Sequence, residues 1–79
     1  MKITAVESFL KDNQNKKNDT VMVLTLGAQS TLSIRKPKLN LDDGTLTGVT
    51  FAGFGQNLMS RVVFDVAGIA ALMEEVNDA

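Results

Sequence analysis

Side chains that could carry out catalysis are few in this sequence, because histidine, cysteine and tyrosine are all absent. A catalytic base or nucleophile needs a pKa suited to its role, and the remaining candidates are serine, threonine, lysine and carboxylates. Ser60 beside Arg61, and Ser33 close to Arg35, form no recognisable triad. The sequence therefore predicts a protein that is not an enzyme.

The two acidic pairs have simpler explanations than catalysis. Asp42 and Asp43 precede Gly44, where carboxylates favour a turn, and on a strand they would point to opposite faces. Glu74 and Glu75 fall on an expected exposed helical surface. The absence of cysteine excludes thiolate metal sites, and the absence of histidine removes the commonest metal ligand at neutral pH. We expect no metal and no other cofactor.

The run RKPK places the positive charges of Arg35, Lys36 and Lys38 within four residues. Such a cluster can neutralise phosphates, and the lysines of the polar segment 11–19 could add to it. Binding of single strands also requires aromatic platforms on which bases stack. Of the four phenylalanines, only Phe54 is expected outside the core. Nucleic-acid binding, to single strands or to RNA, is therefore an alternative function.

The stretch FAGFGQNLMSR places Phe54 between two glycines, which let a loop bend freely. The motif GFG lacks the lysine and the following helix of a phosphate-binding loop. An aromatic residue beside Gln56 and Asn57 suits the tip of a protein-binding loop, although the ring could instead fold into the core. The preferred function is thus a small regulator or adaptor that contacts proteins through Phe54, Gln56 and Asn57. A small-molecule or nucleotide-binding sponge at a subunit interface is a further alternative.

The length of 79 residues bounds the architecture to a single domain, residues 1–79. So short a chain buries only roughly 60% of the surface that its unfolded form exposes. Disulfides and thiolate metal sites are excluded as sources of extra stability, so association of copies remains, and we expect a homo-oligomer. The beginning of the sequence has no apolar run of the signal-peptide type, and no stretch is apolar enough to cross a membrane. We expect a cytoplasmic protein with no membrane partner.

A short helix is predicted at the start of the sequence. Thr4 and Glu7 have the spacing of a capping box, in which both side chains accept hydrogen bonds from free amides. Four apolar residues then share one helical face: Ile3, Val6, Phe9 and Leu10. An edge strand over residues 3–11 is the alternative. The following segment, 11–19, is wholly polar and is expected to be a flexible loop.

Two strands that form a hairpin are predicted next. In TVMVLTL, residues 20–26, both faces are apolar, so both are expected to be covered, one of them by a second copy. STLSIR, residues 30–35, alternates so that Leu32 and Ile34 face inward. Pro37 cannot donate to a strand ladder and predicts an edge or a break.

A second hairpin is predicted around Asp43–Gly44, a dipeptide that favours a two-residue type I′ turn. In that register Leu41 faces Leu46 and Asn40 faces Thr47. The apolar alternation slips after Gly48, because Val49 and Phe51 are out of phase with Leu46. Either a bulge at Gly48 restores the phase, or the two phases line opposite faces of a strand covered on both sides.

The end of the sequence predicts a strand, SRVVFDV at residues 60–66, and then an amphipathic helix over roughly 66–76. Asp65 is a plausible N-cap, and Val66, Ile69 and Met73 repeat at helical spacing. The predicted fold class is α+β: a short N-terminal helix, a four- to five-stranded antiparallel β-meander, and a C-terminal amphipathic helix packed on the sheet. A short helix followed by small strands is similar in size and order to Sm-like RNA-binding rings. No Sm sequence motif is present and the C-terminal helix is foreign to that fold, so the sequence assigns the chain to no family.

Overall fold

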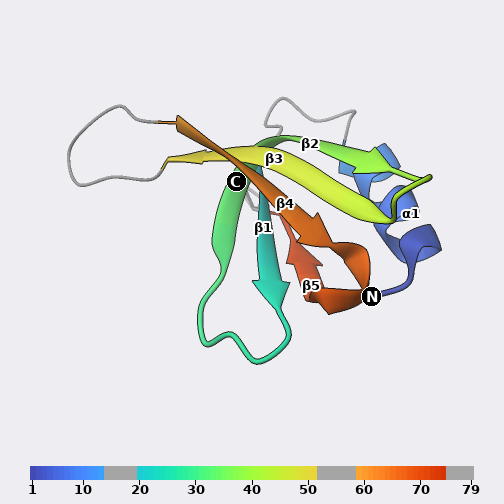
Figure 1. The fold of residues 1–79 in the computed structure, drawn as a ribbon, viewed down its shortest axis with the longest axis horizontal. Coiled ribbons are helices and arrows are strands. Elements are labelled where there is room, and N and C mark those ends of the chain that lie inside the picture. The colour runs from blue at the N-terminus through green and yellow to red at the C-terminus, as the bar shows by residue number, and fades with distance from the viewer. Residues whose placement is uncertain (14–19, 52–58, 75–79) are drawn as a thin grey trace, which may run out of the picture.

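The fold is one helix followed by five antiparallel strands, as seen in a computed structural model that describes residues 1–13, 20–51 and 59–74 (Figure 1). The elements are α1 (Ile3–Asn13), β1 (Thr20–Thr25), β2 (Leu32–Asn40), β3 (Thr45–Phe51), β4 (Met59–Asp65), the 3-10 turn η1 (Val66–Gly68) and β5 (Ile69–Met73). The strand order in the sheet is β4-β3-β2-β1-β5. The predicted α+β class, N-terminal helix and antiparallel sheet are confirmed.

The sheet is a meander only through its first four strands. β5 does not continue beside β4 but pairs with β1, at the opposite edge of the sheet. The chain makes this change within the three residues of η1, so the sheet must curl to bring its two edges together there. The Met1 ammonium group donates hydrogen bonds at the same corner, to the carbonyls of Val66 at 3.1 Å and Ile69 at 2.8 Å.

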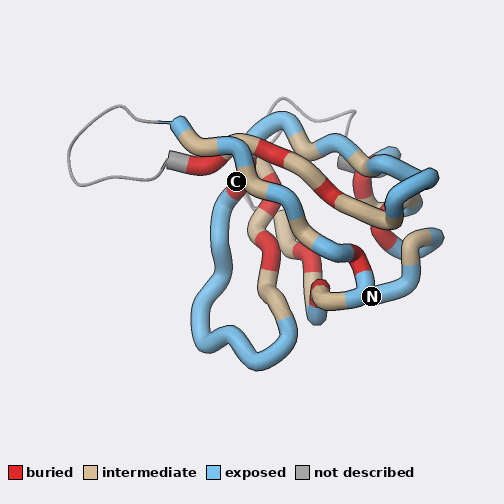
Figure 2. The backbone as a smooth tube through the Cα atoms, viewed as in Figure 1, coloured by how far each residue is buried: buried red, intermediate tan, exposed pale blue. Residues whose placement is uncertain are grey.

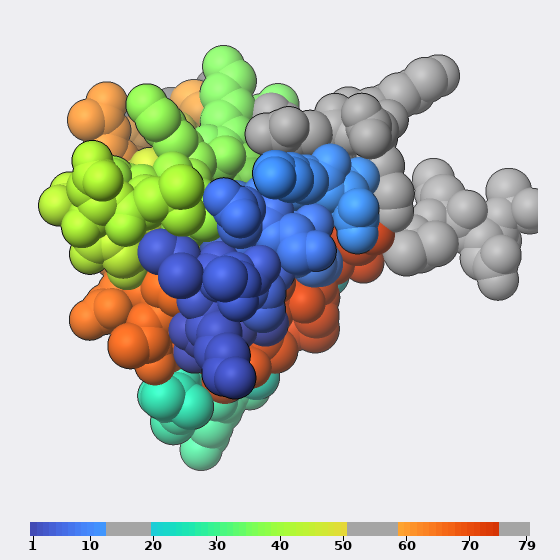
Figure 3. Space-filling view, turned by 90° about the vertical axis from the view of Figure 1, so that its right-hand side faces the viewer, coloured from blue at the N-terminus to red at the C-terminus, as the bar shows by residue number. Residues whose placement is uncertain are grey.

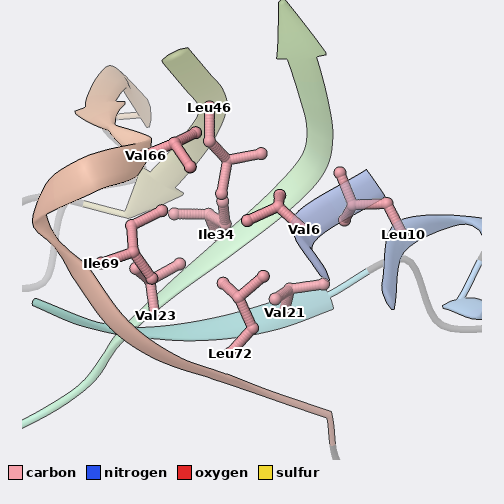
Figure 4. Close-up of a cluster of buried hydrophobic side chains, with 9 residues drawn as sticks. All are labelled: Val6, Leu10, Val21, Val23, Ile34, Leu46, Val66, Ile69 and Leu72. Atoms are coloured by element: carbon pink, nitrogen blue, oxygen red, sulfur yellow. The ribbon is translucent and has the colours of Figure 1, made fainter. Parts of the chain in front are cut away.

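The hydrophobic core lies inside the curl of the sheet, against α1 (Figures 2 and 4). Its buried side chains come from α1, β1, β2, β3, η1 and β5: Val6, Leu10, Val21, Val23, Ile34, Leu46, Val66, Ile69 and Leu72. From β4, Val62 and Phe64 pack against this core as partly buried side chains. On β1, Val21 and Val23 are buried in this core, whereas Met22 and Leu24 are half-buried on the outer face. The prediction that both faces of this strand are apolar and covered is therefore met only in part.

The helix uses the predicted apolar face. Val6 and Leu10 are buried, and Ile3 and Phe9 pack against the core as partly buried side chains. Figure 3 shows α1 lying between the β2–β3 turn and the segment of η1 and β5. The predicted capping box is wrong, because the helix begins at Ile3 and Thr4 therefore lies inside its first turn.

The predicted C-terminal amphipathic helix is wrong. Asp65 does cap the start of a helical turn, since its Oδ1 accepts a hydrogen bond from the Ala67 amide at 3.1 Å. That turn ends at Gly68, and Ile69–Met73 pairs with β1. Leu24 and Thr25 are neighbours on β1, but their partners on β5, Ala71 and Ile69, are two residues apart. Ala70 is therefore an extra residue in the ladder. This bulge lets Ile69 and Leu72 both face the core, a three-residue spacing that in the sequence is typical of a helix.

The β1–β2 hairpin is confirmed, with Val21 opposite Ile34, although Leu32 is 39% exposed rather than buried. The register of the second hairpin is wrong. Asn40 faces Thr45 and Leu39 faces Leu46, so the connection has four residues, 41–44.

The side chain of Asn40 holds this longer turn. Its Nδ2 donates to Asp43 Oδ2 at 2.9 Å, and its Oδ1 accepts from the Asp42 amide at 3.2 Å. Gly44 has a positive φ of 67°, but Asp43 does not share it, whereas a type I′ turn needs both.

The predicted bulge at Gly48 is also wrong, because β3 pairs with β4 in one uninterrupted register from Thr45 to Phe51. Leu46, Gly48 and Thr50 are buried on the inner face, while Val49 is half-buried on the outer face. The alternative, in which the two apolar phases line opposite faces of the strand, holds for Leu46 and Val49. An irregularity does occur at this level of the sheet, but it lies on β2.

Candidate functional site

The irregularity in β2 is a bulge at Lys36 and Pro37. Arg35 pairs with Val49 and Lys38 pairs with Thr47, so two residues of β2 oppose the single residue Gly48. Lys36 adopts a positive φ of 52°, which is uncommon for a residue with a side chain. Pro37 has no N–H to donate to the ladder, so a local break in the pairing at this position leaves no donor unpaired. The break predicted at Pro37 is therefore confirmed.

The bulge decides which face the cations occupy. Arg35 and Lys38 are three residues apart, and in a regular strand such residues point to opposite faces. The extra residue restores their phase, because their partners Val49 and Thr47 both lie on the outer face of β3. Arg35, Lys36 and Lys38 are all exposed as a result.

A fourth cation reaches this surface from a strand that is distant in sequence. Val49 pairs with Arg35 on one side and with Arg61 of β4 on the other. The three residues thus form one row across the outer face of the sheet. Two strand spacings separate the backbones of Arg35 and Arg61, or about 10 Å, within reach of one another's long side chains. We name the surface formed by Arg35, Lys36, Lys38 and Arg61 the cationic face.

A shallow hollow of about 330 Å³ lies in the cationic face. Its lining residues are Lys36, Lys38, Thr47, Gly48, Val49 and Arg61. No acidic side chain is among them, so nothing in the lining neutralises the positive charge. The Thr47 hydroxyl donates to the carbonyl of Lys38 at 3.3 Å, which fixes the orientation of this lining residue. The arrangement favours an anion that meets several cations at once.

A second hollow, of about 280 Å³, lies between α1 and the end of β2. Its lining combines Glu7, Leu10, Lys11, Pro37, Lys38, Leu39 and Leu41. Lys38 borders both hollows, but here a carboxylate from Glu7 shares the surface with two lysines. The net positive charge is therefore greater in the first hollow.

The aromatic side chains that the structure describes do not line the cationic face. Phe9 and Phe64 are half-buried and pack against the core, as the sequence predicts. The predicted protein-binding residues Phe54, Gln56 and Asn57 lie outside the described residues, and so does the side chain of Phe51. The described part of the site can therefore contact phosphates but supplies no stacking platform.

No protein-family model matches this chain. Searches of curated proteins and of solved structures likewise return no match. In residues 1–13, 20–51 and 59–74, no group of three or more histidine, cysteine or acidic side chains could hold a metal ion. Among the helices of these same ranges, none is long and apolar enough to cross a membrane.

The serine and acidic residues considered for catalysis are spread over the molecule. Ser33 is exposed on β2, and Ser60 is half-buried on β4. Asp42 and Asp43 bond within the turn that Asn40 organises. Sequence reasoning missed Arg61 as a member of the cationic face. The sequence signal for Arg61 was its place on the expected exposed face of the strand SRVVFDV. The neighbouring residues do not indicate which strand pairs with this one.

Proposed function

We propose that this protein is a non-enzymatic binding protein whose cationic face binds nucleic acid. The observation that carries the proposal is the convergence of Lys36, Lys38 and Arg61 on one hollow without an acidic lining residue. These cations come from two strands on either side of β3, so the sheet holds their spacing. A surface of this kind meets successive phosphates along a chain.

The contacts are to phosphates rather than to bases. Lysine offers a point charge and arginine a fork of donors, and both fit phosphate oxygens. The exposed side chains of the face include no described aromatic residue on which a base could stack. Binding is therefore expected to be insensitive to sequence and sensitive to salt. If all four cations neutralise phosphates, the logarithmic salt slope should be about −3 to −4.

The order of the elements removes one of the two differences from Sm-like RNA-binding rings, the C-terminal helix that is foreign to that fold. The other difference, the absence of an Sm sequence motif, remains. In the structure η1 and β5 occupy the residues predicted to form that helix, so the order is a helix followed by strands throughout the described chain. This similarity is one of element order alone.

The test is binding of a labelled RNA, a single-stranded DNA and a duplex at low salt, measured by fluorescence anisotropy. Changing Arg35, Lys36 and Lys38 together to glutamine should weaken binding to every sequence alike and flatten the salt dependence. A matched comparison uses two single variants that each remove one charge: Lys38→Gln, which lines the hollow, and Lys2→Gln, which does not. Only Lys38→Gln should weaken binding. Failure of the unmodified protein to bind any of the three at low salt would retire the proposal.

A protein partner is the second candidate, and a different surface favours it. Met59 and Val63 are 55% and 63% exposed on the outward side of β4, beside Arg61. Phe54, Gln56 and Asn57 shortly precede this strand in the sequence. An adaptor that uses Phe54 would extend its contact along β4.

Self-association belongs to the same proposal. The sequence predicts self-association because both faces of the strand at residues 20–26 are apolar. On the outer face of this strand, however, Met22 and Leu24 are already half-buried. The large apolar side chains that are most exposed on the described strands are Met59 and Val63 of β4. The mass in solution, measured by light scattering, tests whether copies associate, and a monomer at high concentration would contradict it.

A further inference from the structure

The outer edge of β4 offers a ladder of backbone groups to a further strand. Every residue from Met59 to Asp65 has a partner on β3, and β4 pairs with no other strand of the described sheet. Edge strands are commonly protected by proline, by lysine or by a bulge. The sequence of β4, MSRVVFD, contains neither proline nor lysine, and its register on β3 is regular. This edge therefore has the features of a pairing surface.

The other edge of the sheet is less suited to pairing. β5 has five residues against seven in β4, and the bulge at Ala70 interrupts its regularity. None of its side chains is among the large exposed hydrophobics, whereas Met59 and Val63 are. Of the two edges, β4 combines a regular backbone with exposed apolar side chains.

We propose that a second copy of this chain pairs with β4, antiparallel, about a two-fold axis centred on Val63. The inference rests on the proposed self-association and names its surface. In this register Val63 faces its own copy, and Arg61 of each copy faces Asp65 of the other. Directly opposite residues of antiparallel strands lie about 4.5–5.5 Å apart, close enough for both ion pairs. On the inner face Val62 meets Phe64 of the second copy, and both are partly buried apolar side chains.

The outer side chains of β4 are self-complementary only in this register. The outer face of β4 carries a basic, an apolar and an acidic side chain in turn, at Arg61, Val63 and Asp65. When a second copy runs antiparallel about Val63, each Arg61 lies opposite an Asp65. Moving the axis to Val62 would place Arg61 opposite Val63 and Asp65 opposite Met59, so neither charge would meet a partner. Asp65 uses Oδ1 to cap η1, which leaves its second oxygen to accept from arginine. A two-fold dimer is also the commonest closed assembly.

The dimer would join the two cationic faces on one continuous sheet. Arg35, Lys36 and Lys38 lie on the same outer face as Arg61, two strands in from the paired edge at β2. Two copies would therefore present these cations on both sides of the central pair of β4 strands. In the dimer Arg61 pairs with Asp65, so a nucleic acid that spans both faces would meet Arg35, Lys36 and Lys38 of each copy.

The test uses a chain that has no cysteine of its own. Val63→Cys places two thiols opposite each other at the axis, at a separation that suits a disulfide. Mild oxidation should convert most of this variant to a covalent dimer. The matched control is Leu26→Cys, since Leu26 is 67% exposed but lies beyond the end of β1. It should remain largely monomeric on denaturing gels.

Charge reversal gives an independent measurement. Arg61→Glu replaces both ion pairs of the dimer with two repulsive pairs, each between the new glutamate of one copy and Asp65 of the other. Sedimentation of this variant should therefore show a monomer. Lys11→Glu makes the same change on α1 and should leave the mass unchanged. A monomeric unmodified protein would overturn both the self-association and this surface. A dimer that survives Arg61→Glu and yields no Val63→Cys cross-link would overturn the surface alone. Nucleic-acid binding is measured separately, with the glutamine variants of Lys36 and Lys38, so its failure is distinguishable.

Discussion

Ile34 and Gly48 lie in contact across the β2–β3 pair, at the level of the bulge. A Cβ atom added to Gly48 would stand 2.8 Å from Ile34 Cδ1 and 2.9 Å from Ile34 Cβ. Ile34 is fully buried, so the side chains packed around it would have to shift to make room for that atom. The absence of a side chain at position 48 therefore allows the core to close beneath the cationic face.

Gly48→Ala should destabilise the fold by about 1–3 kcal/mol, the usual cost of overpacking a core. The Ile34 Cβ is part of the clash, so trimming the end of that side chain with Ile34→Val should not restore stability. Gly68→Ala is the control, because a Cβ there meets nothing within 4 Å and its φ is not positive. Urea unfolding measures both. A Gly48→Ala variant as stable as Gly68→Ala would contradict the close contact.

Lys36→Gly should separate backbone strain from charge at the bulge. Glycine adopts a positive φ without a steric cost, whereas alanine retains the cost. Lys36→Gly is therefore expected to be more stable than Lys36→Ala by up to about 1 kcal/mol. Both variants lose the same charge and should weaken nucleic-acid binding equally. Equal melting temperatures for the two would show that residue 36 is not held at positive φ.

Asp65→Ala should cost about 1 kcal/mol through loss of the η1 cap. Asp65→Asn retains an oxygen that can accept from the Ala67 amide, so it should retain most of the stability. Both variants remove the carboxylate that the proposed dimer places opposite Arg61. Thermal melting should therefore distinguish them, while sedimentation should show weaker association for both. A cap that contributes nothing would leave the two melting curves superimposed.

Phe54→Ala distinguishes a recognition residue from a core residue without knowledge of the partner. If the ring contacts a partner, the variant should keep its melting temperature and lose affinity worth ~2 kcal/mol or more. If the ring is in the core, the change should cost ~3–5 kcal/mol, enough to unfold much of so small a domain. A drop of many degrees would therefore remove Phe54 from the binding surface.

The local patterns of the sequence were sufficient for most elements of the fold. The apolar face of residues 3–10 predicted α1, and the alternation in residues 20–26 and 30–35 predicted the first hairpin. These patterns succeed because a helix and a hairpin bury side chains at periods that neighbouring residues reveal. The helix predicted at the C-terminal end is wrong, because Val66, Ile69 and Met73 repeat at helical spacing in a segment that forms η1 and a strand. In this strand the bulge at Ala70 turns Ile69 and Leu72 to the core. The pairing of this strand with β1, far away in sequence, outweighed the local preference.

Most of the candidate site was present in the sequence by itself. The run RKPK identified three of its four cations, and Pro37 marked a break in the strand. Composition alone removed histidine and cysteine chemistry. The tertiary structure decided how the cations meet. One extra residue in β2 reverses the face of every side chain beyond it, which puts Arg35 and Lys38 on the same side. Arg61 joins them only because β3 pairs with both β2 and β4, and such long-range pairing is set by burial of the common core rather than by any local signal.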